Sequence, residues 1–252
     1  MRFISIMFFC FAALNIYAQN VVSKVTYLEQ AKSNKFGTFY SDLWFDNNSS
    51  LFIEIPNELK NSTKKDGDGT TFIQHINTPD KELDYYFHQI NKSEFLFRHH
   101  YMGKSLYVKD TLEFDWEIKG QTKKILGYRC QMATTIFKGR NYIAWFNTEL
   151  IYPFGPWKFH GLPGLIMELK EENNLVHFYI KRMELNKKDI NRIDLSEVSF
   201  KDNDYLNFEM YCLEKKILLK KTVKLLQSRL PQGTNLAEEC KDCDDDELEV
   251  CN

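Results

Sequence analysis

The 252-residue sequence is poor in the two residues that most often interrupt regular structure, with 11 glycines and 6 prolines, and its net charge is only −2. This content, together with 43% hydrophobic and 15% aromatic residues, excludes a collagen-like or largely disordered chain. The near-neutral charge also argues against nucleic acid as a partner, because nucleic-acid-binding faces are usually strongly basic and clustered. The composition predicts a globular protein with a substantial core.

No apolar run reaches the roughly 20 residues that a membrane-spanning helix needs. The longest run extends from Phe3 to Ile16, follows the basic Arg2 and ends in Tyr17-Ala18-Gln19. This order is typical of a secretory signal peptide. We expect cleavage after Ala18, which would leave a periplasmic or secreted protein with no transmembrane segment in the mature chain.

The common catalytic motifs are also missing. The sequence has no GxSxG, P-loop, GxGxxG or HExxH pattern. The adjacent His99 and His100 should face opposite sides of a strand, so the pair cannot hold one ion as regular β structure. We therefore predict no catalytic residue and consider a non-enzymatic function better supported, with an uncharacterised hydrolase kept as an alternative.

What the sequence does contain is a series of short segments rich in aromatic and β-branched residues, from Val21 to Leu185. Close turns separate them, for example at Lys138-Gly139-Arg140-Asn141 and at Glu171-Glu172-Asn173-Asn174. Such a series favours a meandering antiparallel sheet. A short helix from Asp80 to Tyr86 competes with a strand there.

One amphipathic helix, or two, is indicated near the C-terminus, from Asn203 to Leu230. Its apolar residues recur at spacings of three and four, and it should end at Pro231 and Gly233. We therefore expect residues 1–18 to be a signal peptide, residues 19–235 a single mainly β (α+β) domain that includes this amphipathic helix, and residues 236–252 an acidic tail.

The stretch "FGPWKFHGLPGLI", from Phe154 to Ile166, combines three glycines and two prolines with large apolar residues. With the preceding "WFNTEL", it resembles the signature of the GLPGLI family, exported proteins of unknown function that are named for the hexapeptide Gly161–Ile166. The resemblance covers about Val22 to Lys181. It implies a large curved antiparallel sheet similar to periplasmic lipoprotein-carrier folds, and it brings no activity with it.

Two interpretations of this motif segment remain open. Prolines cannot occupy a central ladder, and glycines permit positive φ or close backbone approach, so the stretch should form a rigid corner that drives apolar side chains inward. It is either a structural plug or the rim of a ligand pocket. The candidate residues are Trp157, Phe159, His160, Gly161, Leu162, Pro163, Gly164, Leu165 and Ile166.

The cysteines raise a separate chemical question. Eight acids and one lysine give residues 236–252 a net charge of −7, and three cysteines lie among them: Cys240, Cys243 and Cys251. In an oxidising compartment they are expected to form disulfides, whereas clustered thiols and carboxylates could instead bind zinc or copper. Cys130 and Cys212 are the candidate disulfide partners in the body.

These observations lead to a prediction of function. We expect an exported cell-envelope protein that uses a concave, aromatic-rich β-sheet to bind an apolar ligand or to scaffold an envelope partner. The alternative from another class is a metal-handling protein that uses the cysteine-containing tail.

Overall fold

The computed structural model describes residues 22–31, 39–55, 83–90, 92–187 and 204–229. These residues form strands of one sheet and a C-terminal helix. The elements are β1 (Val22–Ala31), β2 (Phe39–Phe45), β3 (Ser49–Ile55), β4 (Tyr85–Gln89), β5 (Glu94–Tyr101), β6 (Lys104–Thr111), β7 (Glu117–Ile125), β8 (Tyr128–Phe137), β9 (Arg140–Asn147), β10 (Leu165–Glu171), β11 (Val176–Lys187) and α1 (Phe208–Arg229).

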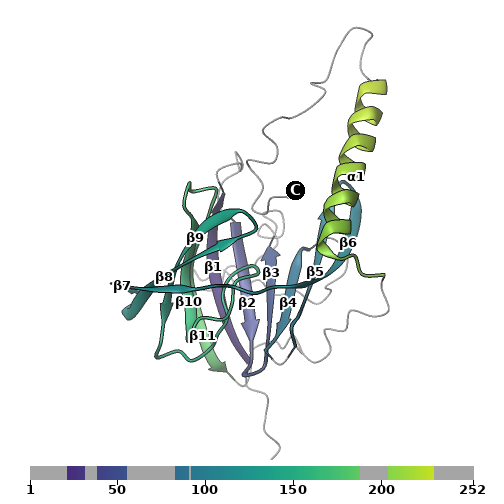
Figure 1. Ribbon diagram of the computed structural model, residues 1–252. Coiled ribbons are helices and arrows are strands. Elements are labelled where there is room, and N and C mark those ends of the chain that lie inside the picture. The colour runs from purple at the N-terminus through teal and green to yellow at the C-terminus, as the bar shows by residue number, and fades with distance from the viewer. Residues whose placement is uncertain (1–21, 32–38, 56–82, 91, 188–203, 230–252) are drawn as a thin grey trace, which may run out of the picture.

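The strands are arranged as two meanders joined at their middle. The sheet order is β6-β5-β4-β3-β2-β1-β11-β10-β9-β8-β7, and every pairing is antiparallel. Pairing of β1 with β11 joins the first six strands to the last five, as Figure 1 shows. The predicted mainly β fold, with a meandering antiparallel sheet and a C-terminal helix, is confirmed.

Glycine is used at the tight hairpins. Three two-residue turns have the sequence X-Gly with positive φ at both positions: Met102-Gly103, Leu126-Gly127 and Lys138-Gly139. This is the type I′ geometry, whose twist matches that of antiparallel strands. The predicted turn at Lys138-Gly139 is thus confirmed, and so is the hairpin between β10 and β11, where Asn174 has φ 58°.

The sheet curves strongly, and the aromatic contacts show by how much. The Trp157 ring lies 6.3 Å from that of Tyr86 on β4 and 6.0 Å from that of Phe137 on β8. In a flat sheet these two strands, seven spacings apart, would lie about 34 Å from each other. One indole can touch both only because the sheet bends around the connection between β9 and β10 (Figure 1).

We call the side of the sheet that packs against this connection the inner face. Alternating residues of β1 to β6 and of β9 to β11 point inward and meet the connection in one large cluster, which includes Tyr27, Phe52, Phe97, Phe146 and Phe178. The opposite, outer face carries a small separate cluster around Trp44, Leu51 and Phe87. The main core therefore lies inside the curve.

Helix α1 begins beside β6. The backbone of Leu206 pairs with Tyr107 and Lys109 and so covers part of the edge of β6. The predicted helix is confirmed as one continuous segment, but among its residues only Tyr211 and Cys212 are buried. Much of its apolar stripe is exposed: Met210, Leu213, Ile217, Leu225 and Leu226.

Several predictions concern residues outside the described part of the chain, namely the signal peptide and the acidic tail. At Asp80–Tyr86 the described residues show the start of β4 at Tyr85, not a helix. In the part of the chain that the structure covers, no helix combines the length and apolarity needed to cross a membrane.

Candidate functional site

A row of polar side chains crosses the inner face at one level. Cross-strand register places Tyr27 opposite Ser41 and Ser41 opposite Glu54, and the Glu54 amide donates to the Asp84 carbonyl at 3.1 Å. Because side chains alternate along a strand, these positions share the face of the core aromatics. We call Glu29, Ser41, Glu54, Asp84 and His99 the polar row.

The β1–β3 end of the row holds two carboxyl groups and a hydroxyl. Ser41 Oγ donates to Glu29 Oε2 at 3.3 Å. Burial raises the pKa of Glu29 to about 7. The pKa of Glu54 is raised well above its ordinary value, first by burial and then by the negative charges of Glu29 and Asp84. Protons are therefore held at this end of the row near neutral pH.

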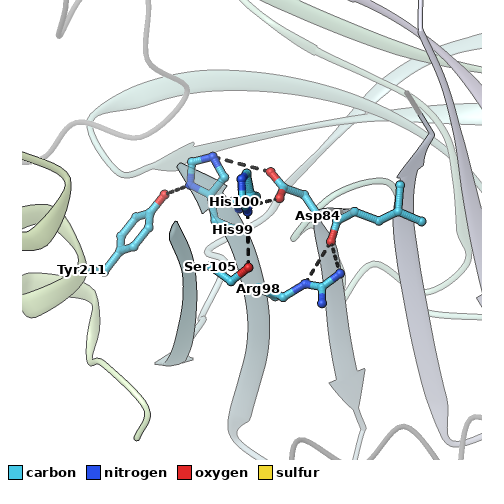
Figure 2. Close-up of polar contacts among 7 residues, drawn as sticks. Asp84, Arg98, His99, His100, Ser105 and Tyr211 are labelled. Carbon is cyan, nitrogen blue, oxygen red and sulfur yellow. Dashed lines mark hydrogen bonds and ion pairs between the residues drawn. The ribbon is translucent and has the colours of Figure 1, made fainter. Parts of the chain in front are cut away.

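At the other end, His99 lies between a carboxyl group and a phenol (Figure 2). His99 Nδ1 is 2.5 Å from the Tyr211 hydroxyl, which α1 supplies, and His99 Nε2 is 3.5 Å from Asp84 Oδ2. The second oxygen of Asp84 accepts the His100 amide at 2.6 Å. These contacts join the sheet to the helix through three ionisable side chains.

Backbone anchoring holds Asp84 in this position. The Arg98 guanidinium donates through Nε and Nη2 to the carbonyl of the preceding Leu83, at 3.1 and 2.7 Å, as Figure 2 shows. On the outer face, His100 Nδ1 lies 3.3 Å from Ser105 Oγ. The adjacent His99 and His100 therefore point to opposite faces, as the sequence predicted.

The charges at this end are set mainly by burial. Burial raises the pKa of Asp84 to about 6, against the opposing effects of the His100 amide and the Arg98 charge. Burial and then the Lys215 and Lys158 charges lower the pKa of His99 to about 3. The uncharged His99 imidazole therefore lies between the Tyr211 hydroxyl, within hydrogen-bond distance of Nδ1, and Asp84 Oδ2, which is 3.5 Å from Nε2.

The motif segment contributes a buried cation beside the row. Lys158 is 1% exposed, and its Nζ lies 3.8 Å from the ring centroid of Phe97 and between 5.2 and 5.9 Å from those of Trp157, Phe208 and Tyr86. Aromatic faces attract a cation through their quadrupole. The positive charge of Lys158 acts on both Glu54 and His99.

The apolar side chains of the motif lie in the core. Trp157, Phe159, Leu162, Leu165 and Ile166 are between 0 and 6% exposed. They pack with the inner-face residues in the main core cluster.

The other motif residues have distinct positions. Gly161 and Pro163 are exposed, and Gly164 is buried. The His160 ring stacks on that of His88 at 3.9 Å, and within the described residues His160 Nε2 has no hydrogen-bond partner.

The cysteines that were candidates for disulfides or metal binding lie partly outside the described residues. Cys240, Cys243 and Cys251 lie outside the described residues. Within the described ranges no group of three His, Cys, Asp or Glu side chains could hold a metal ion. Cys130 is a buried free thiol whose pKa burial raises to about 11, and Cys212 is buried near the start of α1.

Sequence reasoning missed the polar row. Its members come from five separate segments, and each looks like an ordinary polar residue of a strand. The one available signal was strand alternation: Glu29, Glu54 and His99 each lie two positions from an aromatic residue of the same strand, and therefore on the same face of the sheet.

Comparisons with known proteins define the class of fold. No protein-family model and no curated protein matches the chain. The solved structures of PNGF-II in space groups C2 and P21 are similar to it, each with a TM-score of 0.52, at 15% and 14% identity. Each match covers 80% of this chain but only 33% and 34% of the PNGF-II chains. The likeness is one of fold, a β-rich architecture that forms about a third of those longer chains.

Proposed function

We propose that this chain is an exported, non-catalytic binding protein of the GLPGLI family, and that the polar row is where it holds its ligand. The observation that carries the proposal is the gathering of Glu29, Glu54, Asp84 and His99 on one face with pKa values far from their ordinary ones. Desolvating ionisable groups costs stability, and such groups concentrate at functional sites.

The chemistry of the row favours a polar ligand over the apolar one expected from composition. The apolar side chains of the motif are packed against one another in the core, so an apolar ligand would have to displace them. The row is more accessible: the side chains of His99 and Asp84 are 23% and 16% exposed. Protonated carboxyls, a hydroxyl and a neutral imidazole both donate and accept, which suits a ligand rich in hydroxyl or amide groups.

Native mass spectrometry of protein purified from its own cell envelope tests this proposal. We expect a bound mass on the wild type that is lost in Glu54→Gln and in Asp84→Asn. Glu113→Gln, at an exposed carboxyl outside the row, is the matched control and should keep it. A bound mass retained by both row variants, or no polar ligand in any sample, would refute the proposal.

A stability measurement separates binding from a structural role. Because the Glu54 pKa is raised in the folded state, its ionised form destabilises the protein, so Glu54→Gln should raise the melting temperature at pH 8. Loss of ligand together with a gain in stability identifies a binding residue. Loss of both would mean that the row serves the fold.

One observation favours a second candidate, acid–base catalysis by a hydrolase. Glu29 and Asp84 have pKa values of about 7 and 6, which suit a general acid or base near neutral pH. In this case a panel of nitrophenyl esters and glycosides should include a substrate whose turnover is abolished by Asp84→Asn. Turnover that Asp84→Asn leaves unchanged, or none in the wild type, rejects this candidate.

A further inference from the structure

The side of α1 that points away from the sheet carries exposed apolar and basic residues in two separate blocks. Tyr211 and Cys212, the two buried residues of the helix, mark the side that packs on the protein. Residues that recur from Met210 at spacings of three and four lie on the opposite side, because a helix has 3.6 residues per turn. Six of them are exposed: Met210, Leu213, Ile217, Lys220, Lys221 and Lys224. We call these six residues the outer stripe of α1.

The outer stripe is apolar in its first half and basic in its second. Met210, Leu213 and Ile217 form the apolar block, and the three lysines follow them along the helix. Six basic and two acidic side chains give α1 a net charge of +4. Both acids precede residue 215, and one of them, Glu214, pairs with Lys104 at 2.6 Å. The positive charge is therefore concentrated in the second half of the helix.

This second half has little packing to stabilise it. Figure 1 shows α1 extending past the end of β6, and eight of the ten residues from 220 to 229 are exposed. Helical segments this short are marginal in water, and most helical stability in proteins comes from the packing of an amphipathic face. A partner for the outer stripe would have to be acidic beside the lysines and apolar beside Met210, Leu213 and Ile217.

A segment of this chemistry follows in the same chain. Residues 236–252 lie outside the described residues, and their net charge is −7. Their sequence is acidic and then partly apolar: four consecutive acids at residues 244–247 precede Leu248 and Val250. Only residues 230–235 separate α1 from this tail, and they contain a proline and a glycine, which favour a reversal of the chain.

The two blocks are also similarly spaced in both segments. The centre of the three lysines lies about eight residues, or ~12 Å, from the centre of the apolar block along the helix. In an extended chain the midpoint of residues 244–247 lies about 3.5 residues, or ~12 Å, from that of Leu248 and Val250. The apolar block is nearer the start of α1, so the two segments match when they run antiparallel. A reversal after Arg229 produces this orientation.

We propose that residues 236–252 dock on the outer stripe of α1, antiparallel to the helix. The acids at residues 244–247 contact Lys220, Lys221 and Lys224, and Leu248 and Val250 cover the apolar block. The contact goes beyond the ligand-binding function and does not depend on the polar row.

Charge and tethering favour the tail over other occupants of the stripe. A short tether holds the tail at an effective concentration of roughly millimolar, which a separate acidic partner would have to exceed. A second copy of α1 would bring a like charge of +4. An anionic lipid surface would meet a combined charge of −3, from +4 on α1 and −7 on the tail. Both of these alternatives are therefore disfavoured by repulsion.

Carbodiimide cross-linking of the full mature chain tests the contact directly, because the reagent joins lysine amines to carboxylates that touch them. Unlabelled and isotope-labelled protein are mixed under reducing conditions, so that mass separates links within one molecule from links between two. We expect links within one molecule between the stripe lysines and residues 244–247, and we expect high salt to suppress them. Links found only between molecules would assign the stripe to a second copy and overturn the proposal.

Hydrogen exchange of the α1 amides provides the second test. Asp244→Asn, Asp245→Asn, Asp246→Asn and Glu247→Gln combined in one tail variant change no described residue, so the fold should persist. We expect the amides of residues 217–229 to exchange about threefold faster or more in this variant than in the wild type, since each exposed ion pair contributes little. Equal exchange in the two proteins would overturn the proposal.

Lysine variants assign the effect to the stripe. Lys220→Gln, Lys221→Gln and Lys224→Gln in one protein should speed exchange to the same extent, and adding the tail changes should have little further effect. The matched control neutralises three exposed lysines outside α1: Lys92→Gln, Lys124→Gln and Lys181→Gln. It should exchange like the wild type. Phosphatidylglycerol vesicles that protect α1 of the wild type from exchange would assign the stripe to a membrane and also overturn the proposal.

Discussion

Replacing Gly164 with alanine would place a methyl group inside the backbone of the neighbouring strand end. An ideal Cβ at this position lies 2.0 Å from the Asn147 carbonyl oxygen, 2.7 Å from its carbonyl carbon and 3.1 Å from Thr148 Cα. Real Cβ atoms do not approach that closely, and backbone cannot rotate away as a flexible side chain can. Either residue 164 or the end of β9 has to move.

Movement of β9 would break specific contacts. Asn147 is fully buried, its Nδ2 donates to the Arg129 carbonyl at 2.8 Å, and its Oδ1 accepts the amides of Glu149 and Leu150 at 3.1 and 3.0 Å. Overpacking costs about 1–3 kcal/mol, and each lost hydrogen bond about 0.5–1.5 kcal/mol. We therefore expect Gly164→Ala to lower the free energy of unfolding by about 3–5 kcal/mol, a large share of the ~5–15 kcal/mol of a typical domain.

Two other glycines provide matched controls. Gly161 has φ 91° but open surroundings, since the nearest atom to an ideal Cβ there is Trp116 Nε1 at 3.9 Å, so Gly161→Ala should cost only the conformational strain of about 1–3 kcal/mol. Gly120 has neither a positive φ nor any atom within 4 Å of such a Cβ, so Gly120→Ala should be nearly neutral. Urea unfolding followed by tryptophan fluorescence measures all three. A Gly164→Ala protein as stable as Gly120→Ala would refute the reasoning.

Four further predictions concern pH and the chain ends. Burial and then the His88 charge lower the pKa of His160 to about 3, so unfolding takes up a proton at this residue and the free energy of unfolding falls as pH drops below about 6. His160→Gln should reduce the slope of this loss by up to about 1.4 kcal/mol per pH unit. An unchanged slope would contradict the prediction. Because Cys130 is a buried free thiol, non-reducing peptide mapping should find a tail cysteine joined to Cys212, and free tail thiols would exclude this bond. If the tail instead handles zinc or copper, deletion of residues 236–252 should abolish metal retention in an elemental assay, and a wild type without metal would reject that function. N-terminal sequencing of the exported protein should begin at Gln19, and a chain that begins at Met1 would show that no signal peptide is removed.

Much of the fold could be predicted because its determinants are local. Alternating aromatic and β-branched residues define strands, and the X-Gly pairs at Leu126-Gly127 and Lys138-Gly139 adopt the positive φ values that tight hairpins require. The helix beyond residue 203 follows from apolar residues that recur at spacings of three and four. The sequence did not indicate that α1 leaves most of its apolar stripe exposed, because periodicity describes a face and not what covers it.

The motif segment shows both what local sequence can predict and what it cannot. Its glycines and prolines predict a rigid turn, and either Gly161 or Gly164 could have been the position that requires positive φ. In the structure Gly161 has φ 91°, whereas Gly164 is required by the close approach of Asn147. A close approach between segments is a property of packing, and a single segment of sequence does not contain it.

The sequence by itself determined the strands, the hairpin turns and the C-terminal helix, because each depends on residues within a few positions of one another. Only the tertiary structure decided that His99 lies between Asp84 and Tyr211, and that Lys158 lies among aromatic rings beside them. The physical reason is distance along the chain: His99 and Tyr211 are 112 residues apart in sequence, and the docking of α1 beside β6, the neighbour of β5, brings them together. The altered pKa values of Asp84 and His99 follow mainly from the burial that this packing imposes.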